Sequence, residues 1–166
     1  MLLQPLGIDS IKLGEDIINL PDHEPFNAAD KKMFVPGPAA EYWHRFSGDA
    51  SCIENGFGDS FSARYIYFST KDDKKINSIK VFPHDHTGYS LVDYLDKIFG
   101  IGSVAHGNML EGVNPYHYMW NWEKKVDVHY LVPNDLDSGL ECITFRFFLD
   151  FDTLNKYRLL YRTWTK

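Results

Sequence analysis

The chain has 166 residues, of which 44% are hydrophobic, so it is long enough to bury about 70% of the surface that its unfolded form exposes. Its formal net charge of -6 at pH 7 argues against a protein that works by neutralising phosphates, and we expect no nucleic acid among its partners. We predict one domain over residues 1–166.

The N-terminal segment carries short signals that turns interrupt. Residues 7–20 predict an extended piece followed by one or two helical turns, which bury Ile17 and Ile18 and end at Pro21. Three prolines within residues 22–40 predict an irregular loop, or a strand interrupted by turns. This part of the chain therefore adds only short elements to the fold.

The rest of the first half predicts strands. They are expected over residues 42–46, 63–70 and 76–82, and the last two form a hairpin around a charged turn at 71–75. Three glycines within residues 47–60 predict a long exposed loop between the first two strands.

A helix and a run of strands fill the second half. Apolar residues at helical spacing predict a helix over residues 90–99, with Ser90 as its N-cap and Gly100 as its stop. Short polar connections then separate four strand signals, which predict an antiparallel meander over residues 116–122, 126–132, 140–149 and 157–164. In the second of them, alternation places Val126, Val128, Tyr130 and Val132 on a buried face.

These patterns predict an α+β fold with antiparallel sheets and few short helices. Its two halves, 1–87 and 88–166, are expected to follow one plan as pseudo-repeats, in which a short helix precedes several strands.

One segment carries a family resemblance. The sequence Ile-Lys-Leu-Gly-Glu-Asp-Ile-Ile-Asn-Leu-Pro at residues 11–21 is similar to the opening of the helix-plus-sheet repeats in β-lactamase-inhibitor-like and outer-membrane-assembly-lipoprotein-like modules. This resemblance implies a tandem module that binds other proteins. Acidic cytosolic chains of this length resemble, in addition, the immunity proteins that neutralise toxins passed between bacteria.

The cysteine pattern and the N-terminus bear on the cellular compartment. Cys52 and Cys142 lie far apart and lack CxxC spacing, which favours a reduced, cytoplasmic protein. Cys142 is expected to be buried in its strand. The first residues lack the basic segment of a signal peptide, and no run reaches the roughly 18 apolar residues of a membrane span, so we expect no membrane partner.

His84 and His86 form the candidate metal pair. In an extended segment they project to the same side, which suits two imidazole ligands. A solvated turn explains the same residues, and the sequence contains no further metal or nucleotide motif at the required spacing. We expect no cofactor. A small metal-dependent enzyme that uses this pair is the alternative.

Acidic residues gather in the turns at one end of the second sheet. They are Asp135, Asp137, Glu141, Asp150 and Asp152. Turn capping accounts for them, and the functional interpretation is an acidic rim that meets a basic partner.

Aromatic residues occupy alternate positions in the strand over 116–122. Tyr116, Tyr118, Trp120 and Trp122 share one face, which either fills the core or forms an aromatic interface. If they point outward, Trp120 and Trp122 are the partner contacts. The sequence thus favours a protein without catalytic activity that neutralises a cognate toxin by binding it, and a phage or secretion-system adaptor is a further alternative.

Overall fold

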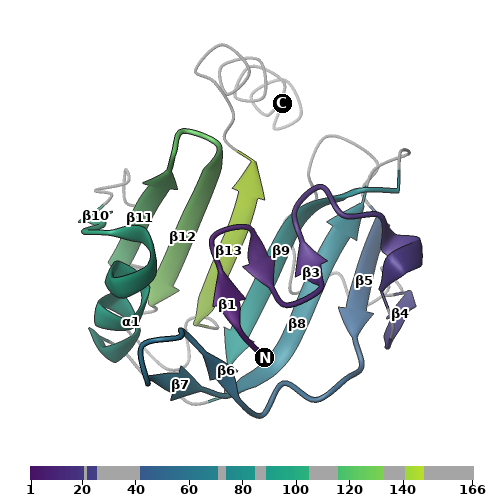
Figure 1. Ribbon diagram of the computed structural model, residues 1–166, viewed down its shortest axis with the longest axis horizontal. Coiled ribbons are helices and arrows are strands. Elements are labelled where there is room, and N and C mark those ends of the chain that lie inside the picture. The colour runs from purple at the N-terminus through teal and green to yellow at the C-terminus, as the bar shows by residue number, and fades with distance from the viewer. Residues whose placement is uncertain are drawn as a thin grey trace, which may run out of the picture.

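A large antiparallel sheet dominates the computed structural model, which describes residues 1–20, 22–25, 42–70, 74–84, 89–104, 116–132 and 141–147 (Figure 1). Its strands are β4 (His23–Pro25), β5 (Tyr42–Phe46), β8 (Ala63–Thr70), β9 (Ile76–Pro83), β10 (Ser103–Val104), β11 (Tyr116–Trp122), β12 (Val126–Val132) and β13 (Cys142–Phe147). Within the described residues they lie in the order β10-β11-β12-β13-β9-β8-β5-β4. A fold rich in antiparallel sheet with few helices is therefore confirmed.

Most of the predicted strands are confirmed. Those at 42–46, 63–70, 116–122 and 126–132 have the predicted bounds, and the one at 76–82 extends to Pro83. The alternation in β12 is also confirmed, since its valines and Tyr130 are buried. The prediction at 140–149 is too long, because β13 covers only Cys142–Phe147. The fourth meander strand, at 157–164, lies outside the described residues.

Strand β13 joins the two halves of the chain. It pairs with β12 on one side and with β9 on the other, where Ile143 lies opposite Val81. Both of its edges are therefore occupied, and the strands of both halves form one sheet. The pseudo-repeat of the two halves stays a prediction, since the counterpart of the second-half helix is a single 3-10 turn over Ile17–Asn19.

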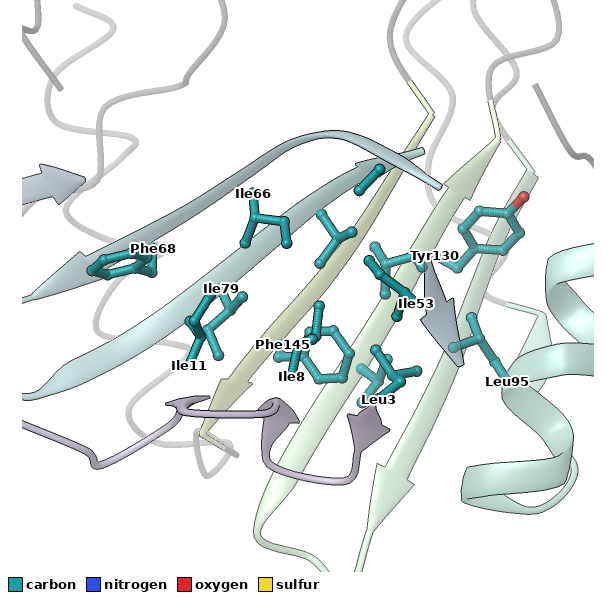
Figure 2. Packing of buried hydrophobic residues seen from close by; sticks show 14 of the residues in the cluster. Leu3, Ile8, Ile11, Ile53, Ile66, Phe68, Ile79, Leu95, Tyr130 and Phe145 are labelled. Carbon is teal, nitrogen blue, oxygen red and sulfur yellow. The ribbon is translucent and has the colours of Figure 1, made fainter. Parts of the chain in front are cut away.

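A second layer covers one face of this sheet (Figure 1). It consists of the small sheet β1 (Leu3–Gln4), β2 (Gly7–Ile8) and β3 (Ile11–Lys12), the hairpin β6 (Ile53–Glu54) and β7 (Ser60–Phe61), and the helix α1 (Tyr89–Phe99). Figure 2 shows Leu3, Ile8 and Ile11 of the small sheet packed over Phe145 and Ile79. Apolar burial between the layers is the main source of stability.

The helix α1 begins one residue earlier than predicted. It starts at Tyr89, so Ser90 lies inside the first turn and the predicted N-cap position is wrong. Leu91, Tyr94 and Leu95 are buried in the same core cluster as the strands, which confirms the predicted apolar face. Within the described residues, no helix has the length and apolar character that crossing a bilayer requires.

Two predictions for the first half are wrong. Of the two isoleucines expected in the core, Ile18 is 84% exposed and Ile17 is only half-buried, because one 3-10 turn is too short to bury both. The loop predicted over 47–60 contains β6 and the start of β7, and Ile53 is fully buried there. The burial of Ile53 thus stabilises a hairpin within a glycine-rich segment.

The small sheet depends on Gly7, the first residue of β2. Its φ is +148°, a value that L side chains rarely adopt. A Cβ at this position would lie 2.1 Å from the carbonyl oxygen of Ile11. Only glycine lets the neighbouring strands approach closely enough to bring Ile8 and Ile11 onto the large sheet.

Candidate functional site

The structure describes one member of the predicted acidic rim. Glu141 is buried, with 7% of its surface exposed, and its Oε1 accepts a hydrogen bond from the hydroxyl of Tyr130. The predicted role at the rim requires an exposed carboxylate, whereas Glu141 is buried. Asp135, Asp137, Asp150 and Asp152 lie outside the described residues.

Three residues of the aromatic face of β11, Tyr118, Trp120 and Trp122, are described with their side chains and pack against the core. Trp120 is only 3% exposed, and its Nε1 donates a hydrogen bond of 2.7 Å to Oδ1 of Asp96 on α1. Tyr118 and Trp122 are half-buried and pack against the same cluster. Of the two interpretations that the alternation allowed, this arrangement favours the core, so Trp120 is not a surface contact.

The predicted histidine pair is only partly described. His84 is exposed directly after β9, and His86 lies outside the described residues. Among the residues that the structure describes, no group of three or more His, Cys, Asp or Glu side chains is arranged to hold a metal ion. The metal-dependent alternative stays a prediction.

The β6–β7 hairpin is a feature that sequence reasoning missed. Its loop is organised by Asn55, which is 4% exposed. The Oδ1 of Asn55 accepts hydrogen bonds from the backbone N–H of Phe57 at 2.9 Å and of Asp59 at 3.2 Å. Its Nδ2 donates to Oδ2 of Asp59 at 2.9 Å. One buried side chain therefore bonds to the tip and to the end of the loop and stabilises its turn.

Two further contacts attach this hairpin to α1. The Nζ of Lys97 lies 2.6 Å from Oδ2 of Asp59, and this hydrogen bond lowers the pKa of the Asp59 carboxyl. The hydroxyl of Tyr94 donates to the carbonyl oxygen of Ile53 at 3.3 Å, and burial raises the pKa of Tyr94 well above its ordinary value. The helix α1 thus contacts the hairpin both before the loop, at Ile53, and at the end of the loop, at Asp59.

The fixed loop presents an apolar side chain to solvent. Phe57, at its tip, is 64% exposed, and Leu2 of the N-terminal segment is 37% exposed. A Cβ at Gly56 would lie 3.7 Å from Cδ1 of Leu2, which places the two segments in contact.

Carboxylates border these apolar side chains. Glu54 is exposed and forms a β-bridge with Leu2, and Asp9 is exposed and accepts a hydrogen bond from the Leu2 N–H at 2.8 Å. We call Leu2, Asp9, Glu54 and Phe57 the hairpin surface. It combines two exposed apolar side chains with two exposed carboxylates.

A signal for this surface exists in the sequence. Asn55-Gly56 is a dipeptide typical of hairpin turns, and glycines flank Phe57 on both sides. The same glycines predict an exposed loop, and only the buried Ile53 separates the two interpretations.

Comparisons with known proteins place no relative beside this chain: no family model, no curated protein and no solved structure matches it. The resemblance to helix-plus-sheet modules and to immunity proteins therefore stays a prediction.

Proposed function

We propose that this chain is an immunity- or inhibitor-type protein, which neutralises a cognate bacterial toxin by binding it in the cytoplasm. The observation that supports this proposal is the hairpin surface, where a fixed loop holds Phe57 in solvent. Aromatic residues are enriched in the cores of protein interfaces.

The rigidity of the loop makes Phe57 suited to binding. A side chain that is ordered before association loses less conformational entropy when it enters a partner's pocket. The three hydrogen bonds of Asn55 and the Asp59–Lys97 ion pair supply that order. We therefore infer that Phe57 inserts into an apolar pocket of the toxin.

The charge of the hairpin surface indicates what surrounds that pocket. Asp9 and Glu54 are exposed at its border, and the chain as a whole carries a net charge of -6. Complementary charges accelerate association and exclude partners of the wrong sign. The proposed toxin therefore presents basic residues around its apolar pocket.

The state of the cysteines supports the cytoplasmic location. Cys52 is exposed and Cys142 is half-buried, and both are free thiols. An unpaired, exposed thiol suits a reducing compartment, where disulfides are rare.

Co-expression tests the proposal. A candidate toxin encoded beside this chain is expressed in bacteria with the wild-type protein, with Phe57→Ala or with the control Ile18→Ala. Ile18 is also an exposed apolar residue, but it lies on the 3-10 turn Ile17–Asn19. We expect the wild type and Ile18→Ala to restore growth, and Phe57→Ala to bind about 30-fold or more weakly.

The outcomes separate the function from the surface. A wild-type protein that neither binds nor neutralises the candidate contradicts the proposed function for that toxin. If the wild type neutralises the toxin and Phe57→Ala binds it with unchanged affinity, the proposed function stands. The hairpin surface is then not the binding site. Circular dichroism of both variants confirms that the fold is intact.

A further inference from the structure

A polar pocket opens where β5 ends and β8 begins. Its volume is about 470 Å³, within the range of small-molecule sites in proteins. The residues on which its chemistry depends are Arg45, Ser47, Asp49, Arg64, Tyr65 and His84.

The fold brings these residues together from three segments. The loop after β5 is tied to β8 by a hydrogen bond from the N–H of Ala63 to the carbonyl oxygen of Ala50 at 2.9 Å. The N–H of His84, just after β9, donates to the carbonyl oxygen of Ser62 at 2.8 Å. Backbone hydrogen bonds therefore shape the pocket before any ligand enters it.

Two arginines, Arg45 and Arg64, are among the residues that line the pocket. The guanidinium of Arg45 lies 5.0 Å from the centre of the Tyr65 ring, a cation–π contact that holds the side chain over the ring. Its ion pair with Glu24 is long, at 3.9 Å, and solvent reaches both side chains, of which 42% and 59% are exposed, so the pair is weak. Arg64 is exposed, and no carboxylate of the described chain lies within ion-pair distance of it.

One carboxylate also lines the pocket, and it is turned onto its own loop. The Oδ1 of Asp49 accepts a hydrogen bond from the backbone N–H of Ser51 at 2.9 Å, which lowers the pKa of Asp49. The lining therefore contains two arginines and one carboxylate that already has a backbone donor. The excess charge in the pocket is positive, although the whole chain is acidic.

We propose that this pocket binds a small organic anion, with a phosphate or carboxylate group on Arg64 and Arg45 and the carbon skeleton against Tyr65. Guanidinium groups match the geometry of both oxyanions through paired N–H donors. The volume accommodates a metabolite-sized molecule. The proposal is independent of toxin binding, since the hairpin surface contributes no residue to the lining.

A titration of the full chain with inorganic phosphate, and separately with acetate, tests the proposal. Backbone amide signals are followed by nuclear magnetic resonance. We expect saturable shifts at Ser47, Ser51, Arg64 and His84, with phosphate binding more tightly because it carries more charge. Saturation by phosphate alone identifies a phosphorylated ligand, and saturation by acetate alone identifies a carboxylate. Both results support the anion site, and saturation by neither overturns it.

Two variants distinguish a specific anion-binding site from nonspecific electrostatic attraction. Arg64→Ala is expected to weaken the bound anion about tenfold or more, whereas Arg64→Lys retains part of the affinity. The control Lys125→Ala removes the same charge from the β11–β12 turn, where Lys125 pairs with Glu123 at 3.3 Å. Equal affinity in Arg64→Ala and Lys125→Ala overturns the proposal. Both positions are exposed, so the variants are expected to fold.

Discussion

The indole Nε1 of Trp120 donates a hydrogen bond of 2.7 Å to Oδ1 of Asp96, which links the centre of β11 to the last turns of α1. The same oxygen accepts the backbone N–H of Gly102 at 3.0 Å. One carboxylate therefore fixes the helix, the strand and the chain that follows the helix.

Replacing Asp96 with alanine is expected to destabilise the protein by about 1–3 kcal/mol, because the Trp120 N–H is left buried without an acceptor. Urea unfolding with the slope held constant measures the change. Asp93→Ala on the same helix is the control, since Asp93 is exposed. Equal midpoints for the two variants would show that the carboxylate of Asp96 contributes no net stability.

Gly7→Ala is expected to destabilise the protein by more than about 3 kcal/mol, since the added Cβ would lie 2.1 Å from the Ile11 carbonyl oxygen. Gly58→Ala is the matched control. Its φ is also positive, at +93°, but nothing lies within 4 Å of the added Cβ, so only the conformational cost of about 1 kcal/mol is expected. Thermal melts compare the two variants. A similar decrease in melting temperature for both would show that the close contact with Ile11 is not the cause of the destabilisation.

Stability is expected to fall as the pH drops below 6.5, through His44. Burial, together with the neighbouring His23, lowers the pKa of His44 from its ordinary 6.5. The unfolded chain then binds more protons than the folded one just below pH 6.5, so the stabilisation is complete above that pH and is lost progressively below it.

The variant His44→Phe tests this prediction. It retains the ring stacked on Phe68, where the centroids are 5.4 Å apart, and removes the titrating group. Urea unfolding between pH 5 and 8 is expected to show a smaller decrease in stability for this variant than for the wild type. Parallel curves for the two proteins would assign the acid sensitivity to other groups.

The two thiols are expected to react at different rates with a thiol reagent at pH 8. Cys52 is exposed and reacts in the folded protein. Cys142 is half-buried, and the burial of its thiol raises its pKa to about 11, so little thiolate is present at pH 8 and reaction is slow. Mass spectrometry after brief labelling is expected to find one modified site, and equal modification of both cysteines would contradict the raised pKa of Cys142.

Reversing the charge at Asp135 and Asp137 to lysine tests the acidic turns as part of a toxin interface. We expect slower association at low salt and a weaker dependence on salt, because charges at the rim of an interface act mainly by steering. Phe57→Ala is instead expected to accelerate dissociation. Association and dissociation rates from surface-immobilised partner distinguish the two surfaces. An unchanged association rate in the double reversal would confine the interface to the hairpin surface.

The sequence predicts the strands well because alternation is a local property. The alternation of Val126 and Val128 predicts the buried face of β12 from the sequence of that strand alone. The pairing of β13 with β9 is different, since Ile143 and Val81 lie roughly 60 positions apart in the sequence. Neither segment contains a pattern that specifies the other as its pairing partner.

The candidate sites follow the same division. The orientation of Trp120 depends on an acceptor from another element, Asp96, so alternation alone leaves it open. The hairpin surface depends on the buried side chain of Asn55. The glycine-rich sequence around it predicts an exposed loop and gives no sign of this burial. The pocket joins three segments that are separated in sequence, which is why its arginines carry no local signal.

The central place of β13 has a consequence for synthesis of the chain on the ribosome. The edges of β9 and β12 can be covered by their native partner only after Phe147 has emerged, although both strands are made earlier. Until then each presents a row of unpaired backbone groups, which favours association between chains. Long-range pairing of this kind also slows folding. A chain that stops before Cys142 lacks the strand that closes its sheet, and aggregation is its expected fate.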